Sequence, residues 1–295
     1  MVTFPTHPGI INLLTIDVED WFHTTALEPF IDRLAWHDLE SRVEKNVRLI
    51  LSILEEHRIH ATFFVLGWVA ERYPHLVREI AALGHEVASH GYQHRLIYKL
   101  TPSVFREYVR RSKQILEDLI GAAVFGYRAT SFSIVNSTLW ALDIIKEAGF
   151  IYDSSMFPIC HDIYGIEGIP VAPFVHPNGL IEIPPSTVRF LGKNIPLAGG
   201  GYFRLYPYWL TRKGIQWLNR DGRPAVVYLH PWELDPSCPR IDRADLRTRF
   251  RQYVNLDKTE RCLKKLLGDF RFSSTNEYLQ AENFLQVSVN TIKEN

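Results

Sequence analysis

The stretch NLLTIDVEDWFH, residues 12–23, runs from an apolar segment directly into three acidic residues. The segment NLLTI (12–16) is short and uninterrupted, which predicts a buried β-strand. Asp17, Glu19 and Asp20 then follow at its carboxyl end. A buried strand with polar residues at its carboxyl end is the repeating unit of functional parallel α/β folds. The fold class therefore depends on whether this unit recurs along the chain.

The unit recurs, with amphipathic helices between the strands. Alternating strands and helices imply parallel pairing through right-handed crossovers, and the number of strands favours a barrel-like closure. Further strands are predicted at 61–66, 85–89, 123–127, 150–152, 180–183 and 225–229. Helices are predicted at 41–57 and 74–83, between Thr101 and Gly121, and between Ser137 and Gly149.

Two segments carry additional local predictions. Ser41 and Glu44 have the spacing of a capping box at the start of helix 41–57. Residues 155–224 contain many Pro, Gly and aromatic residues, which predicts an elaborated loop region with one or two strands and no separate domain. The run AGGGYFR within them lacks the spacing of a phosphate-binding loop, so a flexible loop at a substrate site is predicted instead.

The composition excludes several classes of protein. Of 295 residues, 46% are hydrophobic and 22% are charged, as in ordinary globular proteins. Lys+Arg and Asp+Glu are both 33, so no bulk charge favours nucleic acid or an anionic membrane. No stretch is long and apolar enough to span a bilayer, and the first 17 residues lack the features of a signal peptide, which favours a cytoplasmic location. Three widely spaced cysteines, Cys160, Cys238 and Cys262, predict unpaired thiols.

Polar side chains follow five of the predicted strands. Because the carboxyl ends of parallel strands meet on one face of an α/β barrel, their shared position predicts a single functional site. In chain order these residues are Asp17, Glu19, Asp20, His90, His94, Arg128, Asp153 and His230.

Each of these residues also has an ordinary structural explanation. His90 and His94, four apart in SHGYQH (89–94), fit either a metal site or two hydrogen-bonded structural histidines. Asp20 fits a helix cap, and Arg128 fits a solvated surface charge. His230 lies between an apolar strand and Pro-Trp, where a merely solvated side chain is costly. The combination, rather than any one residue, favours a site.

The segments TIDVED, SHGYQH, YRATSFS, YDSS and LHPWE, in this order, resemble the five motifs of the polysaccharide deacetylases of carbohydrate esterase family 4, the NodB-homology fold. The resemblance implies an α/β fold, a distorted (β/α)7 barrel, in one domain over residues 1–295. The core motifs lie in 12–232, and 233–295 form a C-terminal extension. More narrowly, DVEDWFH, GGGYFR and YLHPWELDP resemble the subgroup encoded with exosortase-linked exopolysaccharide clusters.

The metal site that the resemblance implies contains His90, His94 and one carboxylate. Many family members have two adjacent aspartates, the second of which binds metal, whereas here a valine follows Asp17. Side chains alternate along an extended strand, which places Glu19 on the same side as Asp17. Asp20 takes the role if the strand ends early, so both carboxylates remain candidates. Two imidazoles and one carboxylate suit Zn²⁺, and Co²⁺, Ni²⁺ or Fe²⁺ fit the same ligands.

The resemblance also implies catalytic roles. Asp17 corresponds to the base that takes a proton from water, and Arg128 orients it and keeps it ionised. His230 corresponds to the general acid that protonates the leaving amine, and Asp153 to the residue that positions and tunes this histidine. A backbone N–H near Ser131 is a candidate donor to the tetrahedral oxyanion, beside the metal.

The implied substrate is an N-acetylated polysaccharide or oligosaccharide. Trp21, Tyr202 and Trp232 are candidates for stacking on sugar rings, whereas Phe22 and Phe203 are better explained as core residues. The sequence gives no indication of nucleic acid as a partner, and it predicts no oligomeric state.

Three hypotheses for function follow. The first is a metal-dependent hydrolase that removes N-acetyl groups from N-acetylhexosamine units of a polysaccharide or its precursor. The second keeps the fold and metal but hydrolyses another non-peptide C–N amide. The third is a catalytically inactive carbohydrate-binding protein, which the filled base, metal and acid positions disfavour.

Overall fold

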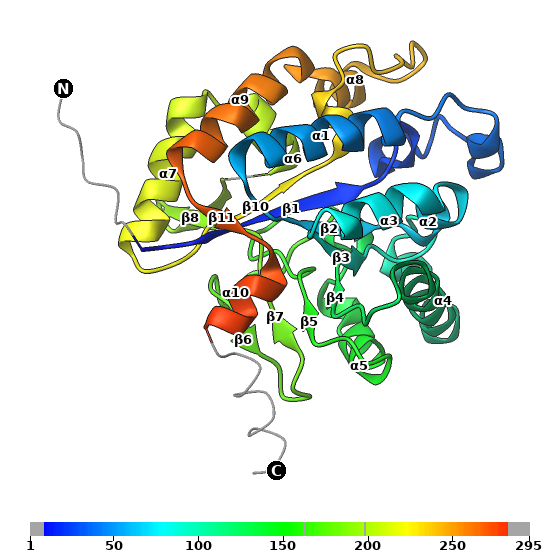
Figure 1. Cartoon of the computed structure of the whole chain (residues 1–295), viewed down its shortest axis with the longest axis horizontal. Coiled ribbons are helices and arrows are strands. Elements are labelled where there is room, and N and C mark those ends of the chain that lie inside the picture. The colour runs from blue at the N-terminus through cyan, green and yellow to red at the C-terminus, as the bar shows by residue number, and fades with distance from the viewer. Residues whose placement is uncertain (1–8, 162, 198, 283–295) are drawn as a thin grey trace.

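The computed structural model describes residues 9–161, 163–197 and 199–282. Nine of its strands form one curled sheet, in which all neighbouring strands are parallel except the pair β6 and β7 (Figure 1). The order across the sheet is β10 (Val226–Leu229), β1 (Asn12–Val18), β2 (Thr62–Val65), β3 (Glu86–Ser89), β4 (Gly126–Tyr127), β5 (Tyr152–Asp153), β7 (Ile181–Glu182) and β6 (Phe174–Val175). The ninth strand, β11 (Phe272–Ser273), pairs with the start of β1.

Helices connect the strands and cover the outer face of the sheet. In Figure 1, α1 and α9 lie side by side over β1 and β10, and the two also contact each other. The helices are α1 (Val43–His57), α2 (Gly67–Arg72), α3 (Pro74–Ala82), α4 (Pro102–Ile120), α5 (Trp140–Glu147), α6 (Gly200–Leu205), α7 (Tyr208–Arg220), α8 (Leu246–Tyr253), α9 (Leu256–Asp269) and α10 (Thr275–Ala281).

Short 3₁₀ helices and one hairpin make up the remaining regular structure of the described residues. The hairpin consists of β8 (Thr187–Phe190) and β9 (Lys193–Pro196) and is separate from the main sheet. The 3₁₀ helices are η1 (Trp21–His23), η2 (Thr25–Leu27), η3 (Arg33–His37), η4 (Ile97–Lys99), η5 (Thr130–Phe132), η6 (Asn136–Thr138) and η7 (Pro231–Leu234).

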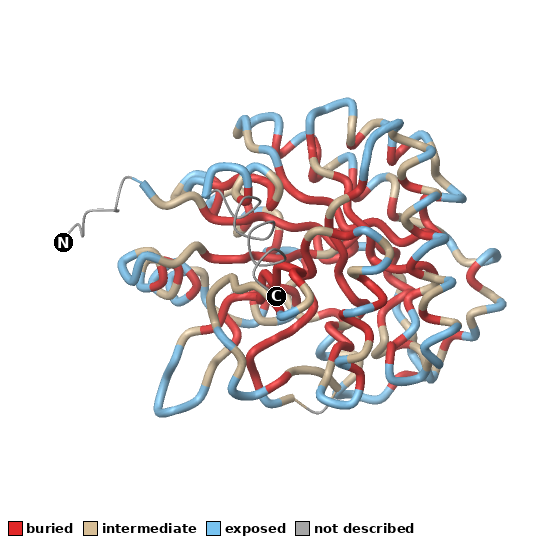
Figure 2. Tube along the Cα trace, turned by 90° about the horizontal axis from the view of Figure 1, so that it is seen from below, coloured by how far each residue is buried: buried red, intermediate tan, exposed pale blue. Residues whose placement is uncertain are grey.

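The strands separate two apolar layers because their side chains alternate between the faces of the sheet. Ile16 and Val18 of β1 pack outward in the large core that includes the apolar face of α1. Leu13 and Phe64 belong to a second, inner cluster inside the curled sheet. Figure 2 shows buried segments of the chain through the middle of the molecule, with exposed segments around them. The predicted barrel-like α/β fold is therefore confirmed, in the form of a curled half-barrel.

The sheet is not closed by strand pairing between β10 and β7 in the described residues. Ser186, which follows β7, lies in this gap and forms two hydrogen bonds with the backbone of Val226 in β10. Its N–H donates to Val226 O (3.4 Å), and its Oγ accepts from Val226 N (2.7 Å). At the amino end of the strands, Leu279 of α10 packs into the inner cluster, so α10 covers the bottom of the half-barrel.

The C-terminal extension is part of this architecture. Beyond residue 233 the chain forms α8, α9, β11 and α10, and β11 joins the main sheet beside β1. The amide of Asn276 in α10 donates to Glu86 Oε2 of β3 (2.9 Å). The residues predicted as an extension thus supply a strand, an outer helix and the bottom cover of the half-barrel.

Three local predictions were wrong. Helix α1 has Arg42 as its N-cap and is not capped by Ser41, because Ser41 donates its hydroxyl proton to Asp20. Residues 155–224 contain two helices, of which α7 buries Thr211, Ile215 and Leu218 at helical spacing. The run AGGGYFR enters α6 rather than a flexible loop.

Glycines in that run allow a close approach between two segments. Gly199 forms a parallel bridge with Tyr228, and a Cβ at Gly199 would lie 2.1 Å from the Tyr228 ring. The glycine run therefore packs against the carboxyl end of β10 and leads into α6.

The signal-peptide prediction falls largely on residues 1–8, which lie outside the described residues, as do residues 283–295 of the extension. Over the described ranges, none of the helices combines the length and apolar character needed to cross a membrane.

Candidate active site

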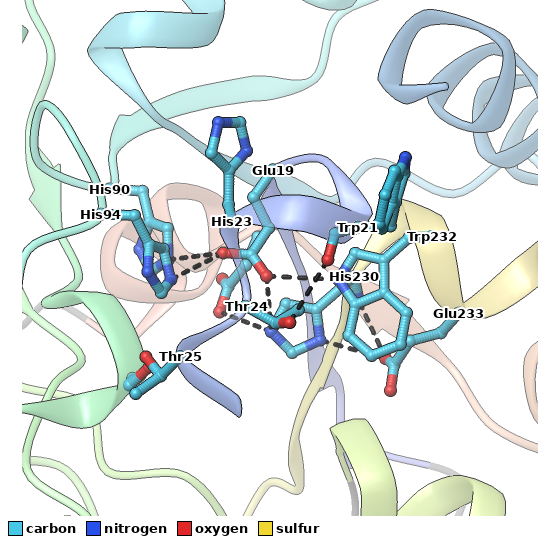
Figure 3. Close-up of polar contacts among 12 residues, drawn as sticks. Glu19, Trp21, His23, Thr24, Thr25, His90, His94, His230, Trp232 and Glu233 are labelled. Atoms are coloured by element: carbon cyan, nitrogen blue, oxygen red, sulfur yellow. Dashed lines mark hydrogen bonds and ion pairs between the residues drawn. The ribbon is translucent and has the colours of Figure 1, made fainter. Parts of the chain in front are cut away.

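The carboxyl ends of four parallel strands bring most of the predicted residues to one cavity. Asp17 lies near the end of β1, His90 directly after β3, Arg128 directly after β4 and His230 directly after β10. The cavity has a volume of about 530 Å³, and Asp17, Glu19, His94 and His230 line it. Figure 3 shows His90 and His94 on one side of Glu19 and His230 on the other.

Glu19, His90 and His94 form a buried three-residue cluster. One ligand atom of each lies within 4.8 Å of the other two. Glu19 Oε2 is 2.7 Å from His94 Nε2 and 4.0 Å from His90 Nε2. The side chains of all three are at most 4% exposed.

This cluster suits a metal ion better than a set of hydrogen bonds. Within the described part of the chain, Glu19 Oε2 is buried without a hydrogen-bond partner, although two imidazole nitrogens face it. Two imidazole nitrogens and a carboxylate oxygen that converge in a buried place without well-directed hydrogen bonds are the ligand types of a bound cation. Glu19, His90 and His94 are therefore the residues that could hold a metal.

The surroundings prepare the His90 imidazole and the Glu19 carboxylate for such a role. Arg128 O lies 3.0 Å from His90 Nδ1, which turns Nε2 toward the cluster. Burial lowers the pKa of His90 to about 4, which keeps its ring neutral. Burial opposes ionisation of Glu19, but the His94 imidazole outweighs it and holds the pKa of Glu19 below its usual range. A neutral imidazole and an ionised carboxylate are the forms that bind metals.

Asp20, the second candidate carboxylate, lies outside this cluster. Its Oδ1 accepts from Trp21 N (2.9 Å), which caps η1. Its Oδ2 accepts from Ser41 Oγ (2.6 Å), Arg42 N (2.9 Å) and Val43 N (3.2 Å). The carboxylate thus supplies the hydrogen-bond acceptors at the start of α1, and the capping explanation that the sequence left open applies to Asp20.

The predicted pair of Asp17 and Arg128 is formed. Arg128 Nη1 donates to Asp17 Oδ1 (2.8 Å) and Thr15 Oγ1 (2.7 Å). Its other nitrogens donate to Ser154 O (3.1 Å) and Ser154 Oγ (2.8 Å). Arg128 is fully buried, so this network fixes Asp17 Oδ1 and leaves Oδ2 directed at the remaining groups of the site.

His230 lies across the site from the two metal-cluster histidines. Its Nε2 is 3.9 Å from both Asp17 Oδ2 and Glu19 Oε1. Its Nδ1 lies 3.2 Å from Glu233 Oε2, which also accepts from the backbone N–H of His230 (2.9 Å). Burial disfavours the charged ring, but Glu233 outweighs this and raises the pKa of His230 to about 9.

Asp153 does not contact His230 and cannot hold its ring. Asp153 Oδ1 accepts from Ser155 Oγ (2.5 Å), and the nearby carboxyl belongs to Glu182. Burial, together with Glu182, raises the pKa of Asp153 well above its usual value. The predicted role for Asp153 fails because of the register between β4 and β5. Asp153 lies opposite Tyr127 in that register, and the Tyr127 ring packs in the outer core. Its side chain therefore lies on the face away from the site.

Of the four candidate substrate contacts, three line the cavity and one does not. Ser131, Tyr202 and Trp232 line the cavity. Trp232 also donates its Nε1–H to Glu19 Oε1 (3.2 Å) and stacks on His230 with ring centroids 5.5 Å apart. Trp21 is buried and absent from the cavity lining, and its Nε1–H donates to Glu40 O (3.0 Å). It serves packing.

Two residues of the site were missed from the sequence. Glu233 lies three residues after His230, and the two form a capping box at the start of η7, a spacing that the sequence does display. Arg204 donates from Nε to Glu233 Oε1 (2.8 Å) and is separated from it by 29 residues. No local pattern marks an arginine in α6 as a partner of η7.

Comparison with known proteins gives two family matches and several similar proteins. Residues 34–152 match the family model described as polysaccharide deacetylase. This part of the chain belongs to the polysaccharide deacetylase match, and it contains His90, His94 and Arg128. Residues 154–280 match a domain of unknown function, DUF3473, so the second match covers α6, α7 and most of the C-terminal part.

The polysaccharide deacetylase domain also has curated relatives and a structural neighbour. A peptidoglycan-N-acetylglucosamine deacetylase of Bacillus cereus is 35% identical over 95 residues, which are 32% of this chain and 34% of that protein. A chitooligosaccharide deacetylase of Bradyrhizobium sp. is 28% identical over 96 residues, 32% of this chain and 42% of that protein. The matched part thus spans less than half of these relatives.

The solved structure of a putative polysaccharide deacetylase from Mycobacterium smegmatis superposes with a TM-score of 0.61 and 20% identity. The superposition covers 96% of this chain and 94% of that chain. At this identity the likeness establishes the fold over nearly the whole chain, including the part beyond the polysaccharide deacetylase match.

Proposed function

We propose that this protein is a metal-dependent hydrolase that removes N-acetyl groups from N-acetylhexosamine units of a polysaccharide or its precursor. One observation carries the proposal: Glu19 and His94 line the same cavity as Asp17 and His230, and His90 completes a buried cluster with Glu19 and His94 beside it. The relatives named as deacetylases of peptidoglycan and of chitooligosaccharides support the acetamide as the reacting group.

Glu19, His90 and His94 would hold one divalent cation, for which we propose Zn²⁺, with Co²⁺, Ni²⁺ or Fe²⁺ as alternatives on the same ligands. When bound, the cation would polarise the acetyl carbonyl and acidify the attacking water. Every other step is assigned to side chains of the chain itself.

Asp17 is the proposed base. Arg128 occupies Oδ1, so Oδ2 is the oxygen that accepts the proton of the attacking water. His230 is the proposed acid, because its Nε2 is 3.9 Å from Asp17 Oδ2 and faces the same space. It donates its proton to the leaving amine nitrogen. Glu233, in place of Asp153, holds Nδ1 and favours the protonated ring.

Ser131, Tyr202 and Trp232 are the proposed substrate contacts. Ser131 is held by Thr25, whose Oγ1 lies 2.7 Å from Ser131 Oγ. A backbone N–H in this turn remains the proposed second donor to the oxyanion. Participation in exopolysaccharide synthesis and a cytoplasmic location stay predictions.

The decisive experiment combines metal analysis with an acetate assay on N-acetylglucosamine oligomers. We expect about one divalent cation per chain and metal-dependent acetate release. Asp17→Asn is the matched variant, because it keeps the shape of the base and leaves Glu19, His90 and His94 unchanged. It should retain the metal and lose about a hundredfold to ten-thousandfold in rate.

Three outcomes separate the hypotheses. A protein that binds metal and hydrolyses a small amide, but releases no acetate from any acetylated glycan, would favour the second hypothesis, a hydrolase of another non-peptide C–N amide. Glycan binding without metal or turnover would favour the third. An Asp17→Asn variant near the wild-type rate would assign the base elsewhere.

A further inference from the structure

The hairpin of β8 and β9 ends in an exposed apolar tip. The register pairs Phe190 with Lys193 and leaves Leu191 and Gly192 as a two-residue loop. Both loop residues have positive φ, 48° for Leu191 and 78° for Gly192. Positive φ at both positions is what the tight turns of such hairpins require, and Asn, Asp or Gly are the residues that usually supply it.

Leucine is a poor choice for this position in two respects. Its Cβ makes the left-handed conformation unfavourable, and Leu191 is 88% exposed to solvent. The preceding Phe190 is 64% exposed. Within the described residues, neither local conformation nor packing accounts for these side chains. They therefore fit a contact with something outside the molecule.

The residues around the tip indicate what that contact is. Arg189 and Lys193, both exposed, flank the apolar pair, and the segment 189–193 contains no acidic residue. Apolar side chains between cations match the interface of a bilayer, where the apolar groups enter the acyl boundary and the cations meet anionic headgroups. A stable protein interface buries about 800 Å² on each partner, far more than two side chains on a loop supply.

We propose that the tip of the β8–β9 hairpin, residues 189–193, inserts into the surface of a membrane that contains anionic lipids. Two apolar side chains and two cations give weak, reversible binding that increases with anionic lipid and decreases with salt. The segment is absent from the lining of the active-site cavity, so membrane binding and the proposed hydrolysis are independent properties.

The test is sedimentation of the full chain with vesicles at low salt. Vesicles of phosphatidylglycerol and phosphatidylcholine in equal parts should bind the protein, and vesicles of phosphatidylcholine alone should bind it more weakly. The double variant F190S/L191N should reduce binding about tenfold. Asn suits the left-handed position, so this variant should unfold at the same temperature as the wild type or higher. R189Q/K193Q should abolish the preference for anionic vesicles.

A matched control is available on η3. Leu34 is 85% exposed, nearly as much as Leu191, but lies outside the hairpin. Leu34→Ser should leave vesicle binding unchanged, and acetate release from soluble oligomers should be unchanged in all these variants.

Several results would overturn the proposal. One is that the wild type does not bind the phosphatidylglycerol vesicles. Another is that F190S/L191N binds them as well as the wild type, and a third is that Leu34→Ser loses as much binding as F190S/L191N. A dimer that F190S/L191N dissociates, without vesicle binding, would make the tip a contact between copies of the chain. Failure of acetate release alone would contradict the proposed function and leave the membrane proposal standing.

Discussion

Glu19 and Asp20 are adjacent carboxylates with different partners. Glu19 faces two imidazoles and has an oxygen without a hydrogen bond within the described residues. Asp20 accepts four hydrogen bonds, from Trp21, Ser41, Arg42 and Val43. The first arrangement suits a cation, and the second suits the start of a helix.

Substitution of the two carboxylates should therefore have opposite effects. Glu19→Gln should lose metal while unfolding at a similar temperature without metal. Asp20→Asn should keep the metal but destabilise the fold by about 1–3 kcal/mol, because buried donors lose a charged acceptor. Elemental analysis and thermal unfolding of the two metal-free variants measure both effects. Metal loss in Asp20→Asn with full occupancy in Glu19→Gln would reverse the assignment.

The carboxylate beside His230 governs its protonation. Glu233 raises the pKa of His230 to about 9 against the opposing effect of burial. Because this value lies above the ordinary 6.5, protonated His230 stabilises the fold fully below pH 6.5, and the contribution is lost as pH rises through about 9. Glu233 lies outside the metal cluster, so its influence remains when a cation neutralises Glu19.

Glu233→Gln should move the alkaline limb of activity toward lower pH, because His230 then loses its proton earlier. Profiles of kcat/KM against pH on an N-acetylated oligomer measure this limb. Asp153→Asn is the matched comparison, since Asp153 is equally buried but contacts Ser155 instead. The limb should stay in place in that variant. A limb that moves only in Asp153→Asn would restore the role that the resemblance implied.

Helix α6 connects the C-terminal part of the chain to the proposed acid. Arg204 donates to Glu233 and, through its other nitrogens, to the backbone oxygens of Arg251, Gln252 and Val254. Its side chain is 2% exposed and that of Glu233 is fully buried. One guanidinium thus joins α6, η7 and the end of α8.

Arg204→Met should be strongly destabilising, by about 3–5 kcal/mol, because it leaves a buried carboxylate without its cation. Turnover should fall as well, since Glu233 is then held by His230 alone, while the metal cluster keeps its ligands. Urea unfolding and metal analysis measure the two effects separately. Arg48→Met, which breaks only an exposed pair with Glu44 and Glu79, should change stability by about 1 kcal/mol or less. Equal effects in both variants would contradict the connecting role.

The two ends of the half-barrel serve different purposes. The cavity and its charged residues lie at the carboxyl ends of the strands, whereas α10 covers the amino ends with Leu279 in the inner cluster. Residues that stabilise the fold and residues that form the site therefore lie at opposite ends of the strands.

Leu279→Ala should cost about 2–5 kcal/mol of stability through the cavity it creates. It should leave metal stoichiometry unchanged, because the cluster lies at the opposite end of the strands. Leu246→Ala, at a residue that is 82% exposed, is the comparison and should change stability by about 0.5 kcal/mol or less. Loss of metal in folded Leu279→Ala protein would show that the two ends are coupled.

The sequence alone determined what depends on short-range order. Alternation along β1 placed Glu19 with Asp17, helical spacing defined the buried face of α1, and strand–helix alternation defined the parallel sheet. Each follows from side-chain periodicity, which neighbouring residues in the chain express directly.

Only the tertiary structure decided which side chains become partners. Asp20 and not Ser41 serves the start of α1, Glu233 and not Asp153 meets His230, and Arg204 reaches Glu233 across 29 residues. Asp153 was misplaced because strand β5 directs it to the outer face, a direction that a two-residue strand does not reveal in its sequence. The partner of a buried charge is set by packing between distant segments, since burial of an unpaired charge is too costly to tolerate.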